Sequence, residues 1–169
     1  MANYSDTFTR ADASSLGADY GTLTGQSAIR IVSNQAAGPG ASTEGTQYVL
    51  SSVVAFGADQ SAEATISGQG ANSDYVGVGV RMGGGDGYVV VTDGTTGVGH
   101  TEFGKWVGGS YTALAGIATT FANGDVIKLS VSGSSPAALI AYKNGASVGT
   151  HNDSTSPITS GQPGMDSYG

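Results

Sequence analysis

The segment Tyr75-Val76-Gly77-Val78-Gly79-Val80-Arg81-Met82 alternates two kinds of residue over eight positions. Because successive side chains of a β-strand point to opposite faces, this period predicts a strand. We expect one face to hold Val76, Val78, Val80 and Met82, and the other to hold Tyr75, Gly77, Gly79 and Arg81. Glycine-rich residues 83–87 then turn the chain, and Tyr88-Val89-Val90-Val91-Thr92 predicts a returning strand. The middle of the chain is therefore predicted to form an antiparallel hairpin.

A second hairpin is predicted toward the C-terminus. In residues 126–131, Ile127, Leu129 and Val131 are expected to point inward, with Lys128 and Ser130 pointing outward. Residues 138–142 form the next predicted strand, and Asn144-Gly145 links it to residues 146–150. Asn-Gly tolerates a positive φ at both central positions, so this link fits a two-residue type I′ turn.

Further strands are expected from shorter alternating runs, and helices are not expected. Glycine or proline interrupts almost every window long enough for a helix. The additional predicted strands are residues 6–10, 28–32, 46–51, 61–66, 99–107, 111–115 and 164–168, whereas residues 33–45 and 151–161 are expected to be surface loops. About a dozen strands exceed a small barrel, so we predict an all-β, two-sheet antiparallel sandwich of the jelly-roll type. We expect residues 1–169 to form one such domain.

Composition excludes several classes of function. The 169 residues carry a formal net charge of −7 and contain no cysteine. A disulfide framework or a thiolate metal site is therefore impossible. Such an acidic chain has no electrostatic footprint for nucleic acid or for an anionic membrane surface. We find no signal peptide and no apolar run of 18 residues, so we expect a soluble protein made in the cytoplasm.

Catalytic motifs are missing, and we predict that the chain is not an enzyme. The three glutamates, Glu44, Glu63 and Glu102, lie far apart in the sequence, and Glu63 is expected on the outward side of its strand. His100 and Glu102 could share one face of a strand, although two exposed strand residues are the simpler interpretation, as is a solvated loop for His151. The chain lacks Gly-x-Ser-x-Gly. Residues 99–105 nearly match the phosphate-binding motif Gly-x4-Gly-Lys-Ser/Thr, but Trp106 occupies the position where the motif needs Ser or Thr.

Calcium is possible but not indicated, and we predict no metal site and no cofactor. Aspartate oxygens on loops are suitable calcium ligands, and the candidates are Asp86, Asp93, Asp125 and Asp153. However, aspartate beside glycine is also ordinary turn chemistry. We favour the turn interpretation for each of them.

Aromatic residues are the remaining candidates for ligand binding. Sugar rings stack on exposed aromatic faces. Trp106 and Tyr111 flank a glycine-rich turn that could display both rings, and Tyr75 and Tyr88 border the central hairpin. These four residues form the predicted glycan-stacking site. Burial of Trp106 in the core is the alternative, since tryptophan usually buries most of its area.

Six short segments occur in an order that suggests a family. They are Asp6-Thr7-Phe8-Thr9-Arg10-Ala11-Asp12 with Ser15-Leu16-Gly17, Asp59-Gln60-Ser61-Ala62-Glu63, Val76 to Arg81 with Gly87-Tyr88, Gly108 to Ala115, Tyr142-Lys143-Asn144-Gly145, and Thr159 to Gly164. Together they resemble concanavalin A-like (laminin-G-like) jelly-roll modules over nearly the whole chain. Tyr20 departs from the tryptophan that many relatives have there, which we expect to affect core packing only. The resemblance implies two curved sheets with the first and last strands close together, and it does not imply one function.

Two non-enzymatic functions remain open. Such a free-standing, unexported module resembles a bacteriophage virion component, namely a head-decoration (cement) protein or a tail or fibre protein. We predict this function, with the major capsid or tail protein as partner and a self-associated form, preferably a trimer. It would reach the virion surface by assembly in the bacterial host cytoplasm. The alternative is a carbohydrate-binding, lectin-like module that recognises surface glycans.

Overall fold

The computed structural model describes residues 2–40, 42–68, 74–93 and 100–169, and these residues form thirteen strands and no helix. No helix long and apolar enough to cross a membrane occurs among them. The strands are β1 (Tyr20–Thr22), β2 (Arg30–Val32), β3 (Gln35–Ala37), β4 (Glu44–Val49), β5 (Gln60–Thr65), β6 (Tyr75–Gly83), β7 (Asp86–Thr92), β8 (Thr101–Val107), β9 (Ser110–Gly116), β10 (Val126–Ser132), β11 (Ala137–Lys143), β12 (Ala146–Asp153) and β13 (Gln162–Tyr168).

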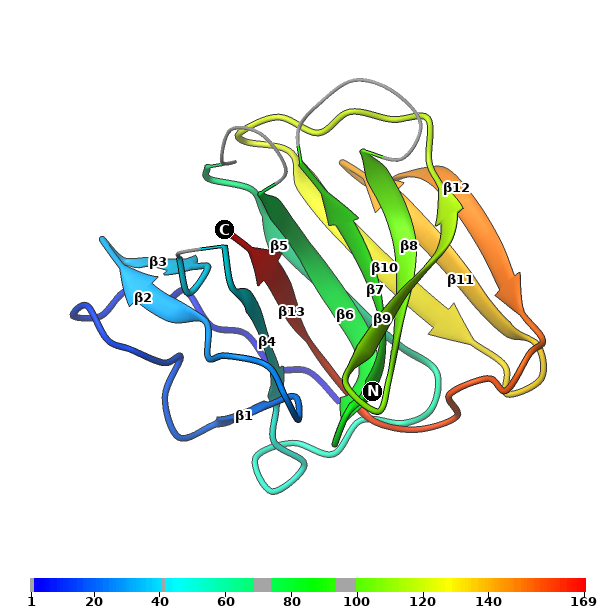
Figure 1. Ribbon diagram of the computed structural model, residues 1–169, viewed down its shortest axis with the longest axis horizontal. Coiled ribbons are helices and arrows are strands. Elements are labelled where there is room, and N and C mark those ends of the chain that lie inside the picture. The colour runs from blue at the N-terminus through cyan, green and yellow to red at the C-terminus, as the bar shows by residue number, and fades with distance from the viewer. Residues whose placement is uncertain (1, 41, 69–73, 94–99) are drawn as a thin grey trace.

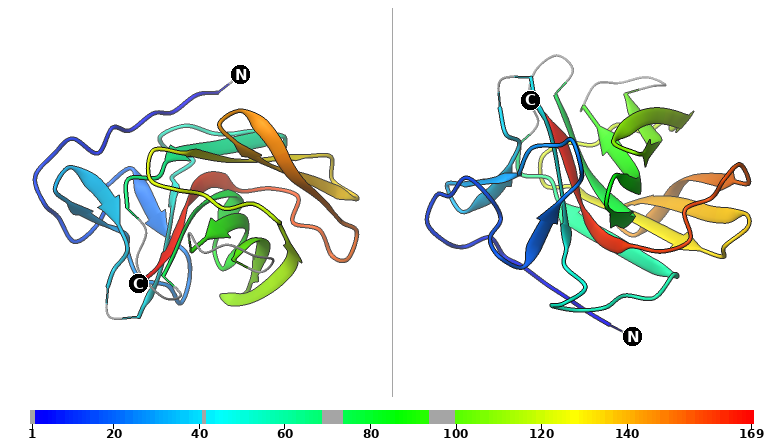
Figure 2. Two further views of the ribbon diagram at one scale, coloured as in Figure 1. Left: turned by 90° about the horizontal axis from the view of Figure 1, so that it is seen from above. Right: turned by 60° about the horizontal axis from the view of Figure 1, so that its bottom comes forward.

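All strand pairs within the sheets are antiparallel, which confirms the predicted sandwich. A seven-stranded sheet has the order β1-β4-β13-β6-β7-β8-β9, and a four-stranded sheet has the order β12-β11-β10-β5 (Figure 1). A short hairpin of β2 and β3 completes the structure. Figure 2 shows this hairpin at one end of the molecule and the yellow and orange strands β10 to β12 at the other. The last strand, β13, lies between β4 and β6, and β4 separates it from the first strand, β1.

The main core lies between the two sheets. Fourteen buried residues form it, including Val78, Val80, Val90, Phe103 and Leu129. A smaller cluster of Leu16, Ile29 and Ile31 packs the hairpin against Met165 of β13. Both clusters cover the same side of the seven-stranded sheet, which we call its inner face. Its other side, the outer face, carries the cluster of Leu23, Met82, Val89, Val91 and Trp106.

The predicted faces hold for most strands but not for Arg81 and Met82. Ile127, Leu129 and Val131 are buried, as expected, and Asn144 and Gly145 both have positive φ. In β6, however, the pairing with β7 is irregular between Val80 and Gly83, and Arg81 has a φ of 52°. A bulge of this kind shifts the alternation by one residue. Met82 therefore lies on the outer face and not beside Val78 and Val80, and the Arg81 side chain points to the inner side and not to the face of Tyr75. Both parts of the prediction were wrong.

Other predicted boundaries also change, and β1 was not predicted from the sequence. Residues 6–10 are not a strand: Asp6 accepts hydrogen bonds from Phe8 N and from both terminal nitrogens of Arg10, which holds this segment as a loop. Residues 35–37, expected to be irregular, form β3 because they pair with β2. β12 continues through Asp153. Gly99, the expected start of another strand, lies outside the described residues, and β8 begins at Thr101.

Arg81 connects the bulge to three distant loops. Its side chain is fully buried and donates to Ala58 O at 2.8 Å, to Ile158 O at 2.6 Å and to Gly133 O at 2.6 Å. Its backbone N–H donates to Gln60 Oε1 at 2.9 Å. The nearest carboxylate, Asp59, is mostly exposed and lies 3.9 Å away. The buried charge is therefore stabilised mainly by backbone carbonyls.

We expect Arg81→Met to lower the free energy of unfolding by about 3 kcal/mol or more, because three buried carbonyl groups would lose their donor. Urea unfolding followed by tryptophan fluorescence measures this. Arg30→Met is the matched control, since Arg30 is exposed and its hydrogen bond to Gly38 O lies at the surface. A loss of equal size in both variants would contradict the assigned role of Arg81.

Candidate functional site

The outer face of the seven-stranded sheet brings together side chains from five strands. Alternation and register place these aromatic residues on it: Tyr48 of β4, Tyr75 of β6, Trp106 of β8, Tyr111 of β9 and Tyr168 of β13. Carboxylates of Glu44, Glu102 and Asp166 belong to the same strands and alternate in the same way. An aromatic surface with hydrogen-bonding groups therefore spans this face.

Glycines beneath the aromatic side chains let them lie close to the sheet. Tyr111 crosses over Gly104, where any β-carbon would overlap its ring. Tyr48 covers Gly21 in the same manner, with a β-carbon there only 2.9 Å from Tyr48 Cζ. Met82 covers Gly164, since a β-carbon there would lie 2.7 Å from Met82 Sδ. These contacts fix the side chains against the backbone and leave little freedom for them to move.

A hydrogen bond between Trp106 and Asp166 shows that the outer face is concave. Trp106 Nε1 donates to Asp166 Oδ2 at 3.1 Å, although β6 and β7 lie between β8 and β13. In a flat sheet these strands would be about 14 Å apart. Asp166 Oδ1 also accepts a hydrogen bond from Thr46 Oγ1 at 2.9 Å. The strands on either side must therefore curve toward each other on this face.

Glu44 and Asp166 are neighbouring carboxyl groups that influence each other's pKa. Asp166 is 3% exposed, and burial raises its pKa. Burial and the neighbouring Asp166 raise the pKa of Glu44 to about 9. Asp166 already accepts from Trp106 and Thr46, so the proton that the pair shares is best placed on Glu44.

Tyr111 is the most exposed aromatic residue of this face. Its ring centroid lies 5.1 Å from that of Trp106, and its hydroxyl donates to Glu102 Oε1 at 2.7 Å. The residue is 38% exposed, so part of its ring remains open to solvent. Burial of its hydroxyl, followed by the hydrogen bond to Glu102, raises the pKa of Tyr111, so it remains a neutral donor. Burial, together with the charges of Glu102 and Asp93, also raises the pKa of Tyr75.

The four predicted stacking residues do not all reach this surface. Tyr111 and Tyr75 do so, and the β8–β9 turn pairs Trp106 with Tyr111 as the sequence suggested. Trp106 itself is only 4% exposed, because Tyr111 covers it. Tyr88 lies on the inner face, fully buried, where its hydroxyl donates to Asp153 Oδ2 at 2.7 Å. Burial therefore leaves neither Trp106 nor Tyr88 open to a sugar ring, in conflict with their predicted role.

Sequence reasoning missed four residues of this face: Glu44, Tyr48, Asp166 and Tyr168. The available signal was a period of two in Glu44-x-Thr46-x-Tyr48 and in Gly164-x-Asp166-x-Tyr168. Each segment by itself resembles any half-exposed strand. Only the pairing of β4 with β13, which joins residues about 120 positions apart, brings the two segments together.

The candidate calcium ligands all have partners within the protein. Asp86 accepts from Gly108 N, Asp93 pairs with His100 at 2.7 Å, Asp125 binds Lys143, and Asp153 binds Lys105. Among the described residues, no group of three His, Cys, Asp or Glu side chains could hold a metal ion. The His100–Glu102 pair, the interpretation that the sequence did not favour, is not formed. His100 pairs with Asp93 instead, and Glu102 accepts a hydrogen bond from Tyr111.

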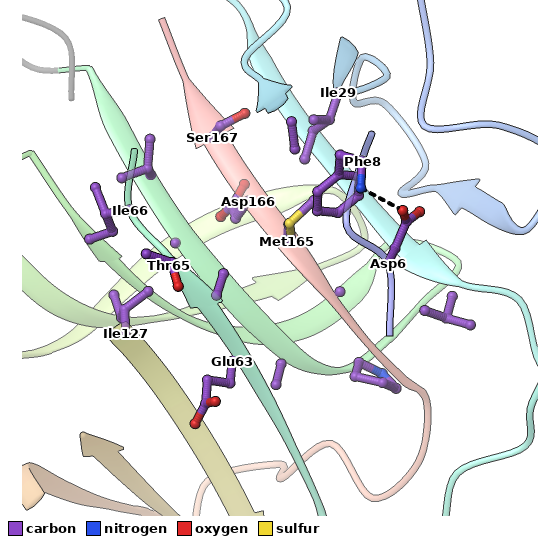
Figure 3. Close-up of a pocket in the computed structure, with 18 of the residues that line it drawn as sticks. Asp6, Phe8, Ile29, Glu63, Thr65, Ile66, Ile127, Met165, Asp166 and Ser167 are labelled. Carbon is purple, nitrogen blue, oxygen red and sulfur yellow. Dashed lines mark hydrogen bonds between the residues drawn. The ribbon is translucent and has the colours of Figure 1, made fainter. Parts of the chain in front are cut away.

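A groove of about 1170 Å³ lies on the opposite, inner side of the sheet (Figure 3). The N-terminal segment and the β2–β3 hairpin form one wall, and β5 forms the other. In Figure 3, Phe8 and Met165 approach each other along one side, and Glu63 and Thr65 project from β5. Phe8 is already covered by the Arg10 guanidinium, 5.6 Å above its ring. The groove is therefore the second candidate location for a ligand.

Comparison with known proteins identifies the fold. No protein-family model matches the chain, and no curated protein does so. Among solved structures, the chain is similar to a carbohydrate-binding module of family CBM66 from Bacillus subtilis, with a TM-score of 0.60 and 16% sequence identity. The match covers 89% of this chain and 88% of that module. The chain therefore has the jelly-roll, concanavalin-like sandwich that its sequence resembles.

We expect Glu44→Gln to remove part of the pH dependence of stability. A folded-state pKa above the unfolded value of 4.5 means that the folded protein holds an extra proton between about pH 5 and 9. The free energy of unfolding then falls as pH rises through this range, by roughly 2 kcal/mol for a partly exposed, proton-sharing group. Glutamine does not titrate, so the variant should equal the wild type near pH 5 and exceed it at pH 8.

Thermal unfolding at intervals from pH 5 to 9 measures this difference. Glu63→Gln is the control. It removes the same charge as Glu44→Gln, but from a side chain that is exposed on β5. Parallel curves for Glu44→Gln and the wild type would show that Glu44 titrates normally.

Proposed function

We propose that the chain is a carbohydrate-binding module whose ligand lies on the outer face of the seven-stranded sheet. The observation that supports this best is the position of Tyr111. Its ring is 38% exposed, lies against Trp106 at a tilt of 60°, and is held by the hydrogen bond to Glu102. An aromatic ring fixed before binding loses little conformational entropy when a sugar stacks on it. The similar fold of the CBM66 module supports the same function.

Hydrogen-bonding groups beside this ring suit sugar hydroxyls. Glu102 uses Oε1 to accept from Tyr111, and no described residue donates to its Oε2. Tyr48, Tyr75 and Tyr168 are half-buried on neighbouring strands and present further hydroxyl groups. Ring stacking together with a few oriented polar groups is the common pattern of small-molecule recognition.

The carboxyl groups of this face favour binding over hydrolysis. Glycosidases use two carboxyl groups about 5 to 9.5 Å apart, one of them free to attack or to activate water. Asp166 is buried with both oxygens occupied, and Glu44 shares a proton with it. We therefore propose a non-catalytic role, in agreement with the sequence prediction. The virion interpretation, with its capsid partners and trimer, has no support in the comparisons.

The test is Tyr111→Ala against a panel of immobilised glycans. We expect a loss of about fivefold or more in affinity for whichever glycan the wild type binds, since a stacking contact is worth about 1 kcal/mol or more. Tyr142→Ala is the matched control, because Tyr142 is a half-buried tyrosine of the other sheet with Lys128 above its ring.

A third variant, Thr65→Trp, obstructs the groove on the inner side without touching the outer face. If Tyr111→Ala binds like the wild type and Thr65→Trp does not, the ligand lies in the groove and the proposed location is wrong. If no glycan binds to the wild-type protein, the proposed function itself is wrong.

A further inference from the structure

The outer face carries no lysine or arginine. The chain has six such residues, and every one is described and engaged elsewhere. Their partners are Asp6 for Arg10, Gly38 O for Arg30, three buried carbonyls for Arg81, Asp153 for Lys105, the Tyr142 ring for Lys128 and Asp125 for Lys143. Lys105 belongs to β8 but points to the inner face, because it alternates with Trp106.

Negative charge on this face is therefore not balanced by a basic side chain within it. Glu102 is half-buried, and its partner Tyr111 is a neutral donor. His100 lies at the end of the face and pairs with Asp93. Any positive charge on His100 would therefore be balanced by Asp93 and not by Glu102. A low-dielectric surface with one sign of charge attracts ligands of the opposite sign and repels those of the same sign.

The aromatic rings favour the same sign of ligand charge. The Tyr111 hydroxyl donates to Glu102 Oε1 at 2.7 Å, and the charge of Glu102 helps to raise the pKa of Tyr75 on the same face. The face of a tyrosine ring attracts cations, particularly next to a carboxylate. A protonated amine on a stacked sugar could therefore contact both a ring face and Glu102 Oε2, whereas a uronate or sulfate group would meet Glu102 with no counter-ion.

We propose that the outer face excludes acidic glycans and that protonated amino sugars are its preferred ligand class. This inference rests on the proposed carbohydrate-binding function and adds the chemical class of the ligand. A neutral sugar is expected to bind through stacking alone and to rank between the two charged classes.

The experiment uses matched sets in which one sugar backbone is presented as its amino, hydroxyl and uronate form. Suitable sets are glucosamine, glucose and glucuronate oligosaccharides, with the galactose and mannose series beside them. At about pH 5.5, where the amine of the sugar is protonated, we expect the amino form to bind about fivefold more tightly than the hydroxyl form. The uronate form should show no binding at the same concentrations.

Glu102→Gln tests whether the preference for amino sugars comes from the charge of Glu102 or from the net charge of the protein. Glutamine keeps an oxygen to accept from Tyr111 but has no charge, so the amino and hydroxyl forms should then bind within about twofold of each other. Asp12→Asn changes the net charge equally outside both candidate sites, keeps an oxygen to accept from Ser33 N, and should keep the fivefold preference.

Three results decide the matter. Uronates that bind as tightly as the hydroxyl forms, or an equal loss of preference in both variants, would overturn the ligand class while leaving the carbohydrate-binding function intact. Failure of every member of every set to bind would instead overturn the proposed function. The expected order, abolished by Glu102→Gln alone, supports both.

Discussion

The buried guanidinium of Arg81 determines how the two sheets and the outer face are arranged. It holds carbonyls from the segment before β5, the turn after β10 and the loop after β12. To reach them, Arg81 adopts a positive φ within a bulge of β6. Gly161 passes so close to this bulge that no side chain would fit there. The arrangement costs backbone strain, which three charge-assisted hydrogen bonds offset.

The outer face depends on the same bulge. Because the alternation shifts at Arg81, Met82 joins Leu23, Val89 and Val91 on the outer face and fills the space above Gly164. This apolar layer lies beneath Trp106, which reaches Asp166 across two strands. Tyr111 then lies on Trp106 and Gly104. The concave aromatic surface is therefore an indirect consequence of one backbone irregularity.

Two buried aspartates show how the protein separates charge between the two faces. On the inner face, Asp153 accepts hydrogen bonds from Lys105 and Tyr88, and these partners lower its pKa despite burial. On the outer face, Asp166 has no cationic partner and shares a proton with Glu44 instead. Lys105, the lysine of β8, points to the inner face and pairs with Asp153 there. This leaves the outer face with carboxylates, tyrosine hydroxyls and no basic group except His100 at its end.

The sequence by itself determined the fold class, most strands and the local pairs. Period-two runs, the Asn144-Gly145 turn and the hairpin that joins Trp106 to Tyr111 depend on backbone geometry between near neighbours, which local residues specify. The tertiary structure alone decided the face of Met82, the burial of Trp106 and Tyr88, and the meeting of Glu44 with Asp166. Those features depend on which distant strands pair, on the curvature of the sheet and on what covers each face. Strand pairing between residues far apart in the chain leaves no local period to detect, because each half has the same pattern as any half-exposed strand.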